Sequence, residues 1–338
     1  MKKKFEFIDY SKGVGIILVI LGHIGFGVKF IYTFHMPLFF LLSGFLMTNI
    51  NEKNFKNFVT GKLRSVIVPY YIFSLLSYVW WGVFERRFRS QEVSPTEALK
   101  DIFLPTMDSM FIYNVVLWFL VTLFFSYIFV FLLIKYFYRN VYIGLAVSFS
   151  LFLTFAHLNA PKIFEMGIVL SGAQLFMTLG HFLRPFIIKK MDEAMKASVI
   201  FNITNCIFLV IFTYSLSNIN NGVNMMSNSY GVYHLFILGG LSGSFLVFYF
   251  SVICIKLRFR FLKFFGVNSL ALMCLHEPIK RITVVLVSKI MRVSNDFVRI
   301  NFFPSIIVLL IVLLISSLYI FLINKIELKL SKINSLQT

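Results

Sequence analysis

The chain has 338 residues, of which 59% are hydrophobic and only 14% are charged, with a mean hydropathy of +0.84 and a formal net charge of +18. A soluble chain carries about 25% charged residues, so the composition excludes an ordinary soluble enzyme and indicates an integral membrane protein. The positive charge does not indicate nucleic acid binding, because the basic residues concentrate in short segments between apolar stretches, where the enrichment of Lys and Arg in cytoplasmic loops explains them.

About ten apolar stretches follow one another, each near the roughly 20 residues that cross a bilayer as a helix. They cover approximately residues 7–27, 33–50, 65–84, 112–134, 140–157, 164–183, 198–217, 231–255, 261–279 and 302–324. We therefore predict an all-α, polytopic membrane helix bundle. The distribution of basic residues predicts that both termini are cytoplasmic. Residues 1–338 are expected to form one domain, with spans within roughly 7–324 and a short cytoplasmic C-terminal tail.

The first stretch contains two ionisable side chains, Lys12 and His23, in a run that is otherwise apolar enough to enter lipid. Such residues are costly inside a membrane and usually face the bundle interior or a watery cavity. Their spacing corresponds to about 16 Å of rise and about three full turns of helix. They should therefore lie on one helix face near opposite ends of the span, which indicates a polar track across the bilayer.

His35 opens the second stretch. If this stretch starts on the side that His23 reaches, a short hairpin through residues 24–34 brings the two imidazoles close together. Two neighbouring histidines could supply a general base and a hydrogen-bonding partner. Interfacial histidines that bond to backbone carbonyls are an equally good interpretation from the residues alone.

The third stretch starts beside Lys62 and Arg64. These residues either anchor the cytoplasmic end of the span or clamp the phosphates of a cytoplasmic cofactor, since Arg offers bidentate geometry. The sequence contains no P-loop and no Rossmann glycine pattern. Trp118, in the fourth stretch, is either an aromatic packing residue or a stacking platform for a sugar.

Two external segments are long enough to contribute to function. Residues 85–111 mix charges with prolines and are predicted to form a loop that contains a helix. Residues 217–230 are rich in Asn, Ser and Gly and suit a polar loop near a sugar or headgroup. A simple solvated connector is at least as good an interpretation of both.

The ninth stretch ends with an imidazole, a carboxylate and a proline, at His276, Glu277 and Pro278. It is broken by Pro278 and followed by Lys280 and Arg281, which leaves its far boundary open. His276 and Glu277 are about 100° apart on a helix, so we expect them not to face one partner unless Pro278 unwinds the backbone. Either can line a cavity. No metal site is expected, because no two His or acidic residues repeat at ligand spacing.

Together these motifs resemble the acyltransferase-3 family of integral membrane acyltransferases, especially the branch related to fucose 4-O-acetylases. The likeness rests on Asp9 to Lys12 followed by His23, on Phe34 to Pro37 with Ser43 to Phe45, on Arg64 with Pro69 and Tyr70, on Trp118 to Leu120, and on Asn268 to Pro278. These stretches occur in the family's order over nearly the whole chain. The family often has Arg where this chain has Lys12, and Lys lacks the bidentate fork that suits phosphate.

The resemblance implies an O-acyltransferase of the bacterial cytoplasmic membrane, with acetyl-CoA or another acyl-CoA as donor from the cytoplasm. The implied acceptor is a carbohydrate or lipid-linked glycan. His23 is then the general base, and His35 or Glu277 orients it or completes the site. Lys12, Lys62 and Arg64 would hold phosphates of the donor, while Trp118 and His276 would contact the acceptor. Lys12 has a second interpretation, as the ion-pair partner of Asp9 one turn earlier.

Two other functions stay open from the sequence. One is a polytopic transporter or flippase for glycans, and the other is a non-catalytic assembly subunit of a polysaccharide synthase. Transporters often have repeated halves with discontinuous helices at matched positions. Here only the ninth stretch looks interrupted, with no matching partner in the first half, so a transporter ranks second. An assembly subunit, which would tolerate loss of His23, ranks third.

Overall fold

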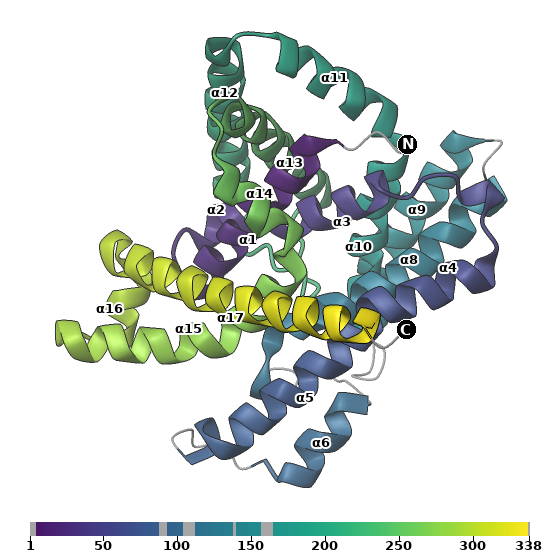
Figure 1. The fold of residues 1–338 in the computed structure, drawn as a ribbon. Helices are drawn as coiled ribbons and strands as arrows, with labels where there is room; N and C mark the ends of the chain where they lie inside the picture. The colour runs from purple at the N-terminus through teal and green to yellow at the C-terminus, as the bar shows by residue number, and fades with distance from the viewer. Residues whose placement is uncertain (1–4, 88–92, 104–111, 138–139, 157–164, 337–338) are drawn as a thin grey trace.

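The computed structural model describes residues 5–87, 93–103, 112–137, 140–156 and 165–336. Within these ranges the chain is helical, contains no strand and has one isolated bridge between Asn224 and Ser229 (Figure 1). The helices of the first half are α1 (Glu6–Ile24), α2 (Val28–Tyr32), α3 (His35–Phe45), α4 (Phe55–Lys62), α5 (Val68–Val83), α6 (Pro95–Phe103), α8 (Trp118–Phe137), α9 (Val141–Ala156) and α10 (Glu165–Phe182). Those of the second half are α11 (Arg184–Lys196), α12 (Val199–Ile219), α13 (Tyr233–Lys256), α14 (Arg260–Val267), α15 (Ser269–Met291), α16 (Asn295–Ile300) and α17 (Phe302–Leu336). The predicted all-α membrane bundle is confirmed.

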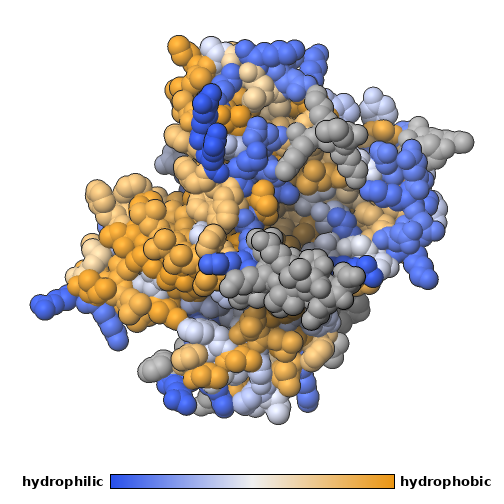
Figure 2. Space-filling view, viewed as in Figure 1, coloured by the Kyte–Doolittle hydropathy of each residue, from blue (hydrophilic) through white to orange (hydrophobic). Residues whose placement is uncertain are grey.

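Seven of the described helical segments are long and apolar enough to cross a membrane. They are Glu6–Ile24, Val28–Phe45, Phe55–Arg87, Val115–Phe137, Val199–Ile219, Tyr233–Lys256 and Phe302–Lys325. Each overlaps one of the ten predicted stretches. The count of ten and the side on which the termini lie stay predictions. Hydrophobic residues cover much of α15 and the N-terminal part of α17, whereas hydrophilic residues gather over α11 (Figure 2).

The ninth predicted stretch differs from the structure. α15 does not stop near Pro278 but continues through it to Met291, and a separate short helix, α14, precedes it. Proline removes one backbone N–H and crowds one carbonyl, which interrupts the hydrogen-bond ladder at a single position without ending the helix. Lys280 and Arg281 therefore lie within a helix rather than in a loop beyond it. The helix expected within residues 85–111 is present as α6.

Close helix crossings at glycine bring α1 and α3 into the centre of the bundle. A Cβ atom on Gly13 would overlap the backbone of Leu262, and one on Gly44 would overlap the backbone of Met177. Small residues at such crossings let helix backbones touch, which is how membrane helices gain packing energy. α1 consequently packs directly on α14 and α3 on α10.

A tight glycine turn sets the position of the last residues of α1. Gly25 and Gly27 both adopt positive φ, at 119° and 64°, a region that residues with a Cβ rarely enter. The N–H groups of Gly25 and Phe26 donate to the carbonyl of Leu21, which closes the end of the helix. The chain thus reverses within a few residues, and His23, in the last turn of α1, faces α15.

Candidate functional site

His23 lies against α15, beside His276 and Glu277. Its ring centroid is 5.2 Å from that of His276, and its Nδ1 is 3.9 Å from Glu277 Oε2. The His23 side chain is 18% exposed, whereas His276 and Glu277 are buried. A partly accessible imidazole beside a buried carboxylate can accept a proton, and the carboxylate then stabilises the imidazolium.

The expectation that His276 and Glu277 do not face one partner was wrong. Both side chains lie next to the His23 ring, and α15 remains helical at these residues. The angle of 100° describes the directions in which the two side chains leave the helix. It does not fix the positions of their terminal atoms, which can approach one partner. Because the His23 ring lies across the face of α15, it lies within reach of both neighbours.

Glu277 is held by two cations from the next turn of α15. Lys280 Nζ donates to both carboxylate oxygens, at 2.9 and 2.8 Å, and Arg281 Nε donates to Oε1 at 3.1 Å. Lys280 Nζ also donates to the backbone carbonyl of His23 at 2.9 Å. This ammonium therefore ties the end of α1 to the carboxylate that faces the His23 ring.

The ion pairs continue beyond the end of α5. Arg281 Nη1 donates to Glu85 Oε2 at 2.9 Å, and Trp80 Nε1 donates to the other oxygen, Glu85 Oε1, at 3.0 Å. Charges buried this deeply are stable only when each has its partners in good geometry. The chain from Trp80 to Glu277 meets this condition and fixes the carboxylate in place.

His35 is near His23 but does not contact it directly. The Tyr32 ring lies next to both, with ring centroids 4.8 Å from His35 and 6.4 Å from His23. His35 is buried, and its Nδ1 lies 2.9 Å from the carbonyl oxygen of Ile31, to which it donates. The imidazole that lies closest to the His23 ring is that of His276, a pairing that the sequence analysis did not predict.

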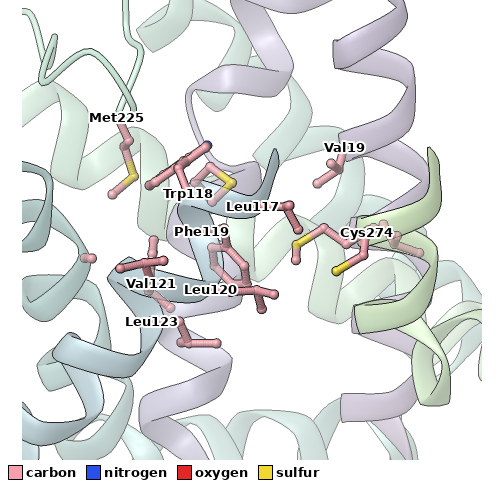
Figure 3. Packing of buried hydrophobic residues seen from close by; sticks show 14 of the residues in the cluster. Val19, Leu117, Trp118, Phe119, Leu120, Val121, Leu123, Met225 and Cys274 are labelled. Atoms are coloured by element: carbon pink, nitrogen blue, oxygen red, sulfur yellow. The ribbon is translucent and has the colours of Figure 1, made fainter. Parts of the chain in front are cut away.

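Trp118 and His23 line the same small pocket. The cavity measures about 20 Å³, is also lined by Val19, Met36 and Met273, and Trp118 is 4% exposed. Around it the side chains are closely packed: Figure 3 shows Leu117 between Trp118 on one side and Val19 and Cys274 on the other. A space of this size accepts about one water molecule and no sugar ring, so Trp118 packs in this arrangement, and its contact with the acceptor stays a prediction.

A larger groove opens between α5 and α15. It has a volume of about 710 Å³, and charged residues of the ion-pair chain, Glu85, Glu277, Lys280 and Arg281, line it together with Arg299. Its walls include Trp80 and Phe84, whose rings are 4.5 Å apart. A groove with an aromatic pair beside charged groups can take up a polyol, since sugars stack on aromatic faces and hydrogen-bond to charged side chains.

A second pocket lies at the other end of α1. It has a volume of about 620 Å³ and is lined by Ser43, Asn57 and Lys62 among others. Lys62 Nζ is 3.4 Å from the centroid of the Tyr127 ring, and the Tyr127 hydroxyl interacts with Ser43 and lies within electrostatic range of Lys12. Tyr127 therefore has both lysines as neighbours, but Lys12 is not among the described residues that line the pocket. Arg64 is exposed and is not among the described residues that line the pocket.

His23, His276 and Glu277 also form a possible cation-binding cluster, with candidate ligand atoms within 4.8 Å of one another. The sequence analysis did not anticipate this arrangement, because the residues come from two distant stretches. Both oxygens of Glu277 accept hydrogen bonds from Lys280, which a metal ion would have to displace. The absence of a metal stays a prediction.

The residues that sequence reasoning missed are Lys280, Arg281, Glu85 and Trp80. Lys280 and Arg281 follow Glu277 at the i+3 and i+4 positions, a spacing that pairs charges on a helix. This signal was available once α15 was taken to continue past Pro278. Nothing in the sequence relates Glu85 or Trp80 to this turn, because more than half of the chain separates them.

Comparison with protein families identifies the chain. The family model of the acyltransferase domain, acyltransferase family 3, matches residues 5–323, which is nearly the whole chain. Neither the curated proteins nor the solved structures provide a match. The chain therefore belongs to the acyltransferase-3 family and is a polytopic membrane acyltransferase.

Proposed function

We propose that the protein transfers an acetyl group from cytoplasmic acetyl-CoA to a hydroxyl of a cell-surface or lipid-linked glycan in the bacterial cytoplasmic membrane. The single observation that carries this proposal is the position of His23: a partly exposed imidazole 3.9 Å from a carboxylate that is itself held by two cations. This arrangement suits general base catalysis at a hydroxyl.

In the proposed reaction, His23 removes the proton of the acceptor hydroxyl while the oxygen attacks the thioester carbonyl. The new C–O bond forms, the C–S bond breaks, and the proton passes from the imidazolium to the departing thiolate. Glu277 faces Nδ1 of His23 and stabilises the positive charge that the ring gains. Nε2, the other ring nitrogen, is then the one that meets the acceptor.

His276 has a different part in this proposal. Its Nδ1 lies 3.3 Å from the carbonyl oxygen of Leu272, so Nδ1 carries the proton and Nε2 is a buried acceptor with no hydrogen-bond partner among the described residues. This nitrogen can receive a hydrogen bond from a glycan hydroxyl next to the reacting one, while the reacting hydroxyl gives its own proton to His23. His35 supports the packing of Tyr32 against His23.

The two ends of α1 receive different substrates in this proposal. The pocket beside Lys12 and Lys62 takes the phosphates of the acyl donor, and the aromatic groove along α15 takes the glycan. Trp80 then replaces Trp118 as the sugar-stacking residue, because Trp80 lines the groove. The donor's thioester arm would extend along α1 from one end to the other.

The test is acetylation of surface glycans by cells that express His23→Ala, measured by mass spectrometry as a mass increase equal to one acetyl group. We expect loss of acetylation with normal membrane insertion. His276→Ala is the matched comparison, because it removes the neighbouring imidazole; it should lower acetylation without abolishing it. Near-normal acetylation by His23→Ala would refute the proposed role of His23, and loss in His276→Ala alone would transfer the base role to His276.

A further inference from the structure

α15 contains a carbonyl group that its own helix leaves without a hydrogen bond. In an α-helix the carbonyl of residue 274 accepts from the N–H of residue 278. Here residue 278 is Pro278, which has no N–H and whose ring crowds this carbonyl. Cys274 is buried, so its carbonyl has no access to bulk water. A buried carbonyl without a donor destabilises the fold.

The side chain of Asn114 fills this position. Its Nδ2 donates to the carbonyl oxygen of Cys274 at 2.9 Å, and it also donates to Ser77 Oγ at 2.9 Å. Asn114 is 0% exposed and lies just before the turn that leads into α8. One amide group therefore connects α15 with α5 and with the start of α8.

The two hydrogen bonds require an amide in one orientation. Rotating the Asn114 amide would point Oδ1 at the carbonyl oxygen of Cys274, and two acceptors repel each other. In the observed orientation Oδ1 is buried without a hydrogen-bond partner among the described residues. A buried, unsatisfied oxygen is unfavourable, so the contribution of Asn114 comes from its two N–H groups.

We propose that Asn114 is a positioning residue that substitutes for the backbone N–H missing at Pro278, and so holds His276 and Glu277 against His23. Glu277 immediately precedes Pro278, and the carbonyl of Cys274 lies one helical turn before Pro278. Without a donor from Asn114, this turn of α15 would have to open or tilt to satisfy the carbonyl of Cys274. Either movement would displace the carboxylate that faces His23.

The role of Asn114 in catalysis rests on the proposed function, but the hydrogen bond itself does not. A double-mutant cycle therefore tests both separately. The variants are Asn114→Leu, which keeps the side-chain size and removes both donors, Pro278→Ala, which restores the backbone N–H, and the double variant. For each purified protein, kcat, KM for the acyl donor and the thermal unfolding temperature in detergent are measured.

We expect Asn114→Leu alone to lower kcat by about tenfold or more, because a displaced Glu277 no longer stabilises the His23 imidazolium, with KM for the donor unchanged. It should also lower the unfolding temperature. In the Pro278→Ala background the same substitution should lower kcat by less than about threefold and lower the unfolding temperature less, because Cys274 then has its own helical donor. A role of Asn114 through packing or through its hydrogen bond to Ser77 alone would not be rescued by a change at residue 278.

Asn202→Leu is the matched control. Asn202 is also 0% exposed, and its Nδ2 donates to the carbonyls of Ala194 and Ser198, away from the site. Its effects should be the same in the parent protein and in the Pro278→Ala background. Equal effects of Asn114→Leu in both backgrounds, on kcat and on unfolding temperature, would overturn the inference. If the substitutions at residues 114 and 278 are coupled in unfolding temperature but His23→Ala remains active, the hydrogen bond to Cys274 is supported and the proposed chemistry is refuted.

Discussion

The cations near the two ends of α1 differ in their partners. At the His23 end, Lys280 and Arg281 form a chain of ion pairs with Glu277 and Glu85. At the Lys12 end, Lys62 lies over the rings of Tyr127 and Phe58, and no carboxylate pairs with it among the described residues. The cations at the His23 end are thus paired, whereas at the other end Glu6 pairs with Lys263 and Lys62 remains available to a ligand.

This difference suits the two ends of α1 to different roles, orientation of a base and binding of an anionic substrate. Paired buried charges keep a fixed geometry, because moving either partner leaves a charge desolvated and unpaired. A cation over an aromatic face is held more weakly and can exchange its neighbour for a phosphate. The paired end therefore suits orientation of a base, and the unpaired end suits binding of an anionic substrate. Four predictions test this distinction, from the largest expected effect to the smallest.

Glu277→Gln should lower kcat by about 10²–10⁴-fold, because the amide cannot stabilise the His23 imidazolium. It also leaves Lys280 without a counter-charge and Arg281 with Glu85 alone. Initial rates of acetyl transfer at saturating donor measure this. Glu193→Gln is the control, since Glu193 is exposed on α11 and pairs only with Lys190 among the described residues. Full activity of Glu277→Gln would show that the fully paired end has no part in the chemistry.

Lys280→Met should destabilise the protein and lower kcat by about tenfold or more. The substitution removes the hydrogen bonds to both Glu277 oxygens and to the carbonyl of His23, and a broken buried ion pair costs about 3–5 kcal/mol. The measurements are the thermal unfolding temperature in detergent and kcat, with Lys190→Met as the exposed control. An unfolding temperature equal to that of the parent would contradict the claim that this end is held by its charges.

Lys62→Met should raise KM for acetyl-CoA about tenfold and leave kcat within about twofold, because a contact with the donor phosphates contributes to binding rather than to the chemical step. Steady-state kinetics measure both constants. The penalty should shrink for a donor that lacks the 3′-phosphate of CoA, if Lys62 contacts this group. A lower kcat at unchanged KM would remove the contrast between the two ends.

Treatment with a chelator should leave the rate unchanged within about twofold, because Lys280 already occupies both oxygens of Glu277. The rate is measured before and after dialysis against EDTA, with metal analysis of the same sample. If the chelator abolishes activity and added zinc restores it, His23, His276 and Glu277 would be metal ligands. The ion pairs at this end would then not be what fixes Glu277.

Parts of the site were predictable because they depend on one helix. Lys12 and His23 lie in a single helix, and the costs of burying them in a membrane pointed to a cavity-facing role. The proximity of His35 across a short turn was also predictable, but not that the Tyr32 ring neighbours both imidazoles. The convergence of His276 and Glu277 on His23 was not, since helix angles alone do not report how far side chains reach.

The sequence by itself determined that this is an all-helical membrane protein of the acyltransferase-3 family, because apolar length and local motifs are properties of single segments. Tertiary structure decided which charges meet. Glu85 reaches Arg281, Asn114 reaches Cys274, and Trp80 rather than Trp118 lines the groove. These contacts join residues far apart in the chain, and their geometry depends on how close the helices pack at glycine crossings and on the continuation of α15 through Pro278.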